Sequence, residues 1–217
     1  PGTQRGTTPY WSPDGEWLAF DRVGEGLWKI RLDGSGATRL APEGPGSTAG
    51  GVVWLEDGRI LFVTGRSAVL QVNDRGGDVV EFSPVLEGEA DFHFLAELPD
   101  GKGFLTTPHR GDVFDTVDVV LPDGTRQEVL KVEGHPLGPT VYSPTGHLIF
   151  VRESSLMAQP LDLATLEVTG YPISLGESVA VDTTTWRAPF TAADNGTLIY
   201  LPAGQPLGRT LRWVRRD

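Results

Sequence analysis

Short apolar runs alternate with clusters of polar turn residues along almost the whole chain, which predicts strands joined by tight turns. The clearest case is Ser12-Pro13-Asp14-Gly15, which the apolar run 17–20 follows directly. In such a turn proline presets φ, aspartate bonds the nearby backbone, and glycine takes a positive φ at no steric cost. The unit therefore predicts a β-hairpin. No segment combines the apolar period of an α-helix with convincing caps.

The same hairpin unit recurs at a nearly constant interval. Its turn glycines stand at positions 15, 58, 101, 146 and 196, so successive units are 43, 43, 45 and 50 residues apart. A period of about 40–50 residues is typical of the four-stranded blades of a β-propeller. We therefore expect an all-β fold, with one propeller domain of about five blades spanning residues 1–217. The repeats are expected at about residues 7–41, 47–86, 89–131, 138–174 and 180–217.

Each repeat is expected to supply up to four strands, called A to D in chain order. In the first repeat they are expected at residues 8–11, 17–22, 27–32 and 37–40. In the third repeat a B–C loop is expected at 108–112, before strands at 116–121 and 126–130. In the fourth repeat strand C is expected at 156–161 and strand D at 167–168, running on towards 173. In the fifth repeat strands are expected at 183–190, 197–201 and 210–214.

The fifth repeat is expected to be incomplete, because the sequence ends at Asp217, where the other repeats have their second hairpin turn. Residues 1–6 are short for a strand that also crosses the blade width, since strands lie about 4.8 Å apart. An unpaired strand edge invites another chain. We therefore expect a homo-oligomer that forms through the incomplete fifth blade.

Composition removes several classes of function. The formal net charge of −11 disfavours nucleic-acid binding, and its simplest meaning is solubility. The chain has no cysteine, which excludes disulfides and thiolate metal sites. No stretch is long and apolar enough for a membrane span. The chain starts with neither methionine nor a signal peptide, so we interpret it as a piece of a longer protein.

Several segments resemble a known family of propellers. The run 12–20, followed by Leu27-Trp28-Lys29-Ile30, resembles the repeat of the TolB-like (WD40-like) propellers. The runs 142–152, 161–170, 194–200 and 209–214 resemble the extracytoplasmic propeller of bacterial serine/threonine protein kinases. This resemblance implies the fold, a periplasmic or extracytoplasmic location and a sensor or interaction role. Members of that subgroup continue with further repeats where this chain ends, and the kinase signatures themselves are absent here.

Candidate chemistry comes from topology, because the D–A and B–C loops of a propeller open on one face, where strand A starts beside the channel. Five residues are expected to meet on that rim as ligand-binding residues: Asp91, His93, His109, His135 and Asp182. Four of them are candidate ligands of a divalent metal such as Zn²⁺ or Ca²⁺, namely Asp91, His93, His135 and Asp182. Asp91 and His93 are two apart on one strand, so their side chains leave the same side. The alternative is that all five are solvated loop residues or members of a hydrogen-bond network.

Three functions remain open at this point. The first is a propeller module that binds a protein or a small-molecule ligand, as a sensor or interaction domain. The second is a metal-dependent hydrolase of the lactonase or phosphotriesterase type, with its site at the channel mouth. The third is a structural fragment that survives by oligomerising. Neither a Gly-x-Ser-x-Gly elbow nor a His-Glu-x-x-His motif is present, so no catalytic residue is assigned.

Overall fold

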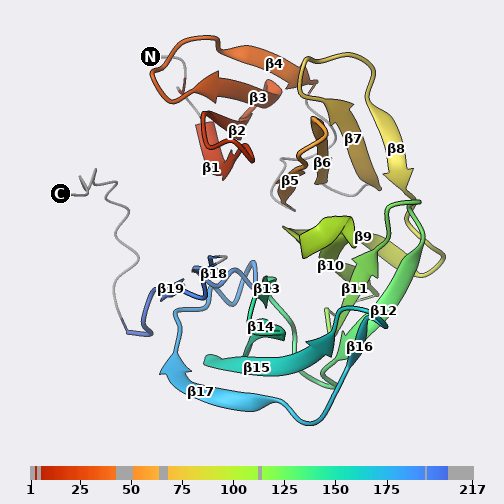
Figure 1. Cartoon of the computed structure of the whole chain (residues 1–217), viewed down its shortest axis with the longest axis vertical. Helices are drawn as coiled ribbons and strands as arrows, with labels where there is room; N and C mark the ends of the chain where they lie inside the picture. The colour runs from red at the N-terminus through yellow and green to blue at the C-terminus, as the bar shows by residue number, and fades with distance from the viewer. Residues whose placement is uncertain are drawn as a thin grey trace.

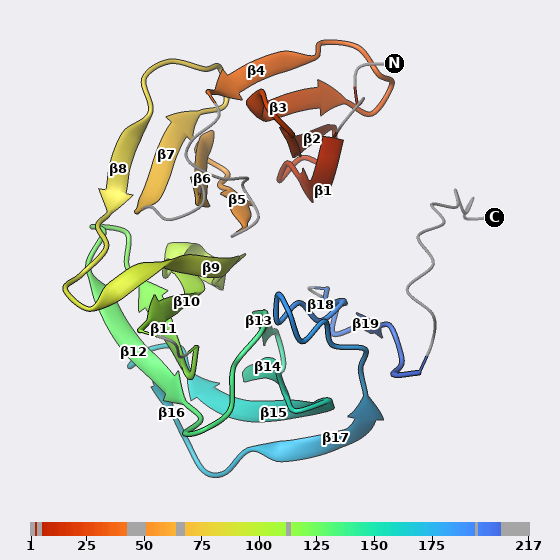
Figure 2. The same ribbon diagram turned by 180° about the vertical axis from the view of Figure 1, so that it is seen from behind.

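The computed structural model describes Thr3 and residues 6–42, 51–63, 68–111, 114–193 and 195–204. These residues form five antiparallel sheets that follow one another around a common centre (Figures 1 and 2). The fold is a β-propeller of about five blades, as the sequence repeats predict. Within the described residues, no helix has the length and apolar character needed to cross a membrane.

The first three sheets each contain four strands in chain order. The first sheet consists of β1 (Gly6–Trp11), β2 (Trp17–Arg22), β3 (Gly26–Arg31) and β4 (Thr38–Ala41). The second consists of β5 (Val52–Trp54), β6 (Arg59–Val63), β7 (Val69–Asn73) and β8 (Val80–Ser83). The third consists of β9 (Glu89–Glu97), β10 (Phe104–Arg110), β11 (Thr116–Val120) and β12 (Arg126–Lys131). A short 3₁₀ turn, η1 (Pro99–Gly101), joins β9 to β10.

The last two sheets depart from four simple strands. The fourth consists of β13 (Thr140–Ser143), β14 (His147–Arg152), β15 (Ser155–Asp162), β16 (Glu167–Val168) and β17 (Ile173–Ser178). Both β16 and β17 pair with β15, so the expected strand D is present as two pieces. Gly170, with φ of 63°, lies between these pieces and turns the chain. In its described part, the fifth sheet consists of β18 (Phe190–Ala192) and β19 (Leu198–Tyr200).

The first strand of each sheet lies nearest the centre. The inner strands β1, β5, β9, β13 and β18 contact one another in that order around the ring. Each inner strand is joined to the next strand of its sheet by one of the five repeated turns. The turn glycines all adopt a positive φ, between 64° and 84°, in Gly15, Gly58, Gly101, Gly146 and Gly196. The turn chemistry therefore marks the same A–B connection in every blade.

Apolar side chains are buried between blades, so each blade depends on its neighbours. One core joins sheets one and two, and another joins sheets two and three, where Phe92 and Phe104 pack against Val53 and Leu61. A third core joins sheets three and four, and a fourth joins sheets four and five. Middle strands bury side chains on both faces, as β6 does from Ile60 to Val63. This explains why their sequences are continuous apolar runs rather than alternating ones.

The prediction that residues 108–112 form the B–C loop of the third repeat is wrong for residues 108–110. Residues 108–110 instead extend β10, where Pro108 lies opposite Phe92 and His109 lies opposite Asp91. Proline is tolerated there because β11 pairs with β10 only as far as Thr106, so this end of β10 has a free edge. The long hairpin of β9 and β10 brings His109 into the sheet.

The fifth blade also differs from the expectation. Strand A was expected at 183–190, whereas β18 begins at Phe190. Before it, Asp182 accepts hydrogen bonds from the backbone N–H of Thr184 at 2.9 Å and of Thr185 at 3.3 Å, and this closes a turn instead of a strand. The strand expected at 210–214, and residues 1–6 apart from Thr3 and Gly6, lie outside the described residues. The expectation of a homo-oligomer therefore stays a prediction.

Candidate metal centre and central cavity

Asp91, His93 and His109 meet where β9 begins and β10 ends. Their potential ligand atoms all lie within 4.8 Å of one another. Oδ1 of Asp91 is 3.0 Å from Nε2 of His93 and 3.1 Å from Nδ1 of His109. The cross-strand pairing of His109 with Asp91 and the two-residue step from Asp91 to His93 place all three on one side of the sheet.

The contacts of the two histidines with Asp91 differ in kind. His109 Nδ1 has hydrogen-bond geometry towards Asp91 Oδ1. His93 Nε2 is as close, but among the described residues this buried nitrogen makes no contact of hydrogen-bond geometry. Ligand atoms about 2.0–2.2 Å from one metal ion lie about 3.0–3.5 Å from each other. The 3.0 Å separation of His93 Nε2 from Asp91 Oδ1 is therefore compatible both with an ion pair and with two ligands of a shared ion.

The electrostatics of the cluster favour an ionised carboxylate. Burial of Asp91 acts to raise its pKa, but the neighbouring His93 and His109 outweigh burial and hold that pKa below its usual range. Asp91 is 8% exposed. An anionic oxygen flanked by two imidazoles is thus available as a ligand near neutral pH.

Phe114 holds the imidazole rings in place. Its ring stacks on His109 with centroids 3.9 Å apart, and it meets His93 edge-on at 5.1 Å. The backbone carbonyl of Phe114 accepts a hydrogen bond from the N–H of Leu137, in the segment that leads into the fourth sheet. The cluster therefore lies at the border of the third and fourth blades, on the side of the D–A and B–C loops.

The structure does not bring His135 and Asp182 into this cluster. The backbone N–H of His135 donates a hydrogen bond to the carbonyl of Val132 and closes a turn. Nδ1 of His135 lies 3.9 Å from Oε1 of the exposed Glu153. The Asp182 carboxylate caps its own turn, and the hydrogen bond from the Thr184 N–H holds the pKa of this carboxyl group below its usual range. His109, expected in a loop as a ligand-binding residue, takes their place beside Asp91 and His93.

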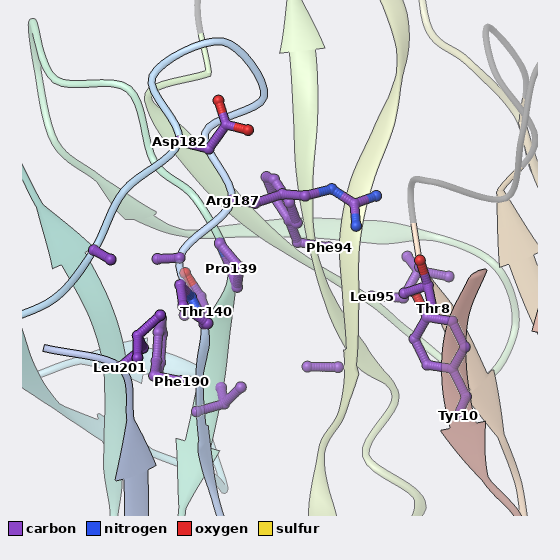
Figure 3. A pocket seen from close by; sticks show the side chains of 16 residues that line it. Thr8, Tyr10, Phe94, Leu95, Pro139, Thr140, Asp182, Arg187, Phe190 and Leu201 are labelled. Carbon is purple, nitrogen blue, oxygen red and sulfur yellow. The ribbon is translucent and has the colours of Figure 1, made fainter. Parts of the chain in front are cut away.

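A cavity of about 570 Å³ lies at the centre of the ring, within the size range of small-molecule sites. It is lined by the inner strands β1, β9 and β13, by β18, and by the residues just before β5 and β18. Its walls are mainly apolar, with Phe94, Pro139, Phe190 and Leu201 among them (Figure 3). Residues in or next to all five sheets thus contribute to one partly open cavity.

Few polar side chains enter this cavity. Arg187 extends from its loop into the hollow, towards the side where Tyr10 lies on β1 (Figure 3). Burial raises the pKa of Tyr10 to about 12; the positive charge of Arg187 opposes that rise, and the negative charge of Asp21 adds to it. Thr140 lies on the cavity wall, but its hydroxyl oxygen is buried away from the open space and has no hydrogen-bond partner among the described residues. The carboxylate of Asp182 points away from the hollow in Figure 3.

The cluster residues do not line the cavity themselves, and β9 reaches the cavity wall at an irregularity that begins with Phe94, the residue after His93. Phe94 and Leu95 together oppose Thr106 across the β9–β10 pair, and Phe94 has a φ of 57°. This β-bulge turns Phe94 into the cavity, while the ring of the preceding His93 remains 5.7 Å from the Phe94 ring. A similar bulge in β1 gives cavity-lining Thr8 a φ of 47°. Positive φ at non-glycine residues costs energy and is concentrated at functional sites.

Comparison with known proteins supports the fold. No family model matches the chain. An uncharacterised protein of Agrobacterium fabrum is 26% identical over 154 residues, which are 67% of this chain and 50% of that protein. The chain therefore spans about half the length of the curated relative that it matches.

Similar solved structures include three proteins with enzymatic or metal-binding names. A luciferin-regenerating enzyme has a TM-score of 0.66 and 13% identity, over 89% of this chain and 67% of that one. Regucalcin, a calcium-binding protein from Agrobacterium tumefaciens, has a TM-score of 0.59 and 16% identity, over 80% of this chain and 62% of that one. A gluconolactonase from Xanthomonas campestris has a TM-score of 0.56 and 14% identity, over 85% of this chain and 68% of that one. At such identities these matches establish the β-propeller fold alone, and the narrower resemblance to kinase-associated TolB-like propellers remains a prediction.

Proposed function

We propose that this protein is a divalent-metal-dependent hydrolase of the lactone or ester class, with the ion held by Asp91, His93 and His109. The observation that carries the proposal is the convergence of one carboxylate oxygen and two imidazole nitrogens within 4.8 Å. The fold it shares with a gluconolactonase and with calcium-binding regucalcin supports this proposal over a purely structural role.

The residues fit a transition metal better than calcium. Two imidazoles and one carboxylate suit Zn²⁺ or Mn²⁺, whereas Ca²⁺ takes six to eight oxygen ligands. Nε2 of His93 is buried 3.0 Å from Oδ1 of Asp91 and makes no contact of hydrogen-bond geometry among the described residues, so it is available as a ligand beside that carboxylate. Three protein ligands also leave coordination positions open for water and substrate.

The chain's own residues would orient and shield the reaction. When bound, the ion supplies Lewis-acid chemistry and an activated water. Phe114 fixes the two imidazole planes and keeps water from one side of His109. Phe94 follows His93 directly and lines the cavity, whose apolar walls would hold the body of the substrate. Tyr10 stays protonated well above neutral pH and is available there as a hydrogen-bond donor.

A binding module without chemistry is the second candidate. The observation in its favour is the hydrogen bond between His109 and Asp91, which satisfies both groups without any ion. In this case the protein is a sensor or interaction domain of the TolB-like propeller type, and its function is to bind a ligand in the cavity.

Metal titration of chelator-treated protein separates the two candidates. We expect Zn²⁺ or Mn²⁺ to bind one site in calorimetry, and His93→Ala to weaken that binding by at least about ten- to hundredfold, because even residues that only support a ligand have effects of that size. His135→Ala is the matched control and should bind the metal like the original protein. Reconstituted protein should hydrolyse δ-valerolactone or phenyl acetate, and His93→Ala should not. Metal binding that is equal in His93→Ala, or absent altogether, would leave the binding module as the function.

A further inference from the structure

The end of β10 that carries His109 has support from only one of its neighbouring strands. β11 pairs with β10 from Phe104 to Thr106, so among the described residues 107–110 pair with β9 alone. Pro108 has no N–H to offer β11. On the β9 side, the register shifts both before and after the pair of His109 with Asp91. The backbone ladder therefore leaves His109 in the least regular part of the hairpin.

The side chain of Arg110 spans this gap. Its Nε lies 3.2 Å from Oε1 of Glu89 on β9, and its Nη2 lies 2.8 Å from Oδ2 of Asp118 on β11. Its Nη1 donates a hydrogen bond to the hydroxyl of Thr116 on β11 and lies 3.6 Å from Oε2 of Glu128 on β12. One guanidinium thus ties the end of β10 to the strands on both sides, which a planar fork of several donors allows.

The carboxylates that anchor Arg110 are fixed points of the third blade. The side chains of Glu89 and Asp118 are almost fully buried. Arg126, from β12, lies 2.8 Å from the second oxygen of Glu89, so this carboxylate is held from two sides. Movement of such a group would leave a buried charge without its partner, which is costly. Arg110 is therefore attached to a rigid frame.

The contacts of Arg110 reach both rings of the stack at the candidate metal centre. Arg110 directly follows His109, and Thr116 comes two residues after Phe114. The hydrogen bond between Arg110 and Thr116 therefore joins the two strands next to the stacked rings, whose centroids are 3.9 Å apart. On the other side, Arg110 lies opposite Glu89, one pair beyond His109. Loss of Arg110 would release this end of β10 from both neighbours.

We propose that Arg110 is a positioning residue of the candidate metal centre. Its contacts with Glu89, Thr116 and Asp118, called the Arg110 clamp below, hold the ring of His109 in its stack. Arg110 acts through His109 and not as a ligand, because a guanidinium is a cation without an acceptor atom. This inference rests on the proposed function only where metal affinity is measured, since the placement of His109 is a property of the metal-free chain.

Histidine NMR signals of the metal-free, full-length chain provide the first test. The chain has four histidines, so replacement of each in turn by glutamine assigns the ring protons. The ring current of Phe114 shifts the signals of His109, and Phe114→Leu gives the unstacked reference. In Arg110→Met the His109 signals should move towards that reference, while those of His147 on β14 should stay. Unchanged His109 signals in folded Arg110→Met would overturn the proposal and leave Arg110 as a partner for buried charge.

A second variant of the clamp covers the case that Arg110→Met does not fold. Thr116→Val removes one hydrogen bond of the clamp and keeps the size of the side chain. It should displace the His109 signals in the same direction by a smaller amount. Unchanged signals in Thr116→Val, with Arg110→Met unfolded, would also overturn the proposal.

Two further variants separate positioning from a general loss of stability. Leu98→Val, at a fully buried position by the turn of the same hairpin, should lower the unfolding temperature and leave the His109 signals in place. Arg110→Lys keeps the charge but loses the fork, so it should recover the unfolding temperature more than the His109 signals. Displaced signals in Leu98→Val equal to those in Arg110→Met, or full recovery of the signals in Arg110→Lys, would refute the clamp.

Zinc titration connects the clamp to the proposed function. Arg110→Met should weaken Zn²⁺ binding by about tenfold or more, the effect typical of residues that support a ligand. Arg152→Met, at an exposed position on β14, should bind Zn²⁺ like the original protein. If the original chain binds no zinc, the metal proposal falls and the metal-free signals still decide the clamp. If zinc binds equally well to Arg110→Met and the His109 signals stay in place, the clamp falls and the metal proposal stands.

Discussion

Replacement of Arg126 by methionine should be among the most damaging single changes in the third blade. Nη2 of Arg126 lies 2.8 Å from Oε2 of Glu89, and its Nη1 lies 3.7 Å from Oδ2 of Asp118. The side chains of Arg126 and Glu89 are only 6% and 2% exposed. The guanidinium also lies 4.8 Å from the ring centroid of Phe92. Methionine would keep most of the packing and remove the charge.

The expected loss of folding stability depends on the contacts that Glu89 would retain without Arg126. Burial acts to raise the pKa of Glu89, but its contacts with Arg126, the N–H of Leu86 and Arg110 outweigh burial and hold that pKa below its usual range. Without Arg126, the nearest cation is Arg110 at 3.2 Å, which is itself 34% exposed and shared with Asp118. Loss of one partner of a buried pair costs about 3–5 kcal/mol, and the remaining contacts place this case near 3 kcal/mol. For a domain of this size that lowers the unfolding temperature by about 6–12 °C.

Urea unfolding followed by circular dichroism provides the assay, in a double-mutant cycle with Glu89→Leu. The double variant should be at least about 1 kcal/mol more stable than the sum of the two single effects predicts, because it leaves no unpaired buried charge. Arg152→Met, which removes an exposed arginine, should change stability by less than about 0.5 kcal/mol. A loss below about 1 kcal/mol in Arg126→Met, or strict additivity in the cycle, would refute the reasoning.

Two further predictions concern single residues. The first compares pH titrations of ultraviolet absorbance for the original protein and for Tyr10→Phe. The difference between the two curves should show a phenol that ionises near pH 12 rather than near pH 10. A step near pH 10 would contradict the burial of the Tyr10 hydroxyl. Because its folded-state pKa is raised, Tyr10 favours the folded state at neutral pH and loses that contribution as the pH rises through the interval from about 10 to 12. Gly103→Ala should cost at least about 2 kcal/mol in urea unfolding, because the new methyl group would collide with the backbone carbonyl of Val120 at a φ of 118°. Gly15→Ala, at a positive φ in open space, should cost about 1 kcal/mol, and equal losses for both would contradict the clash.

The fold could be predicted because its signals are local. Each A–B turn needs a glycine at a positive φ, and the five such glycines set the blade period directly in the sequence. The apolar runs of middle strands follow from burial on both faces between blades. Strand ends were less predictable where a side chain competes with the strand, as Asp182 does by closing a turn just where strand A of the fifth blade was expected to begin.

The candidate site could be predicted only in part, because an irregularity in one hairpin decides it. Asp91 and His93 share a side of β9 by simple alternation. His109 lies opposite Asp91 only because the bulge at Phe94 shifts the β9–β10 register by one residue. Nothing in the sequence marks this bulge, since Phe94 is a poor candidate for positive φ.

The most direct test of the metal proposal is a crystal of the full chain soaked in zinc, measured on both sides of the zinc absorption edge. The account predicts an anomalous peak within about 2.0–2.2 Å of the ligand atoms of Asp91, His93 and His109. Absence of a peak there, or a peak at His135 or Asp182 instead, would contradict the central claim.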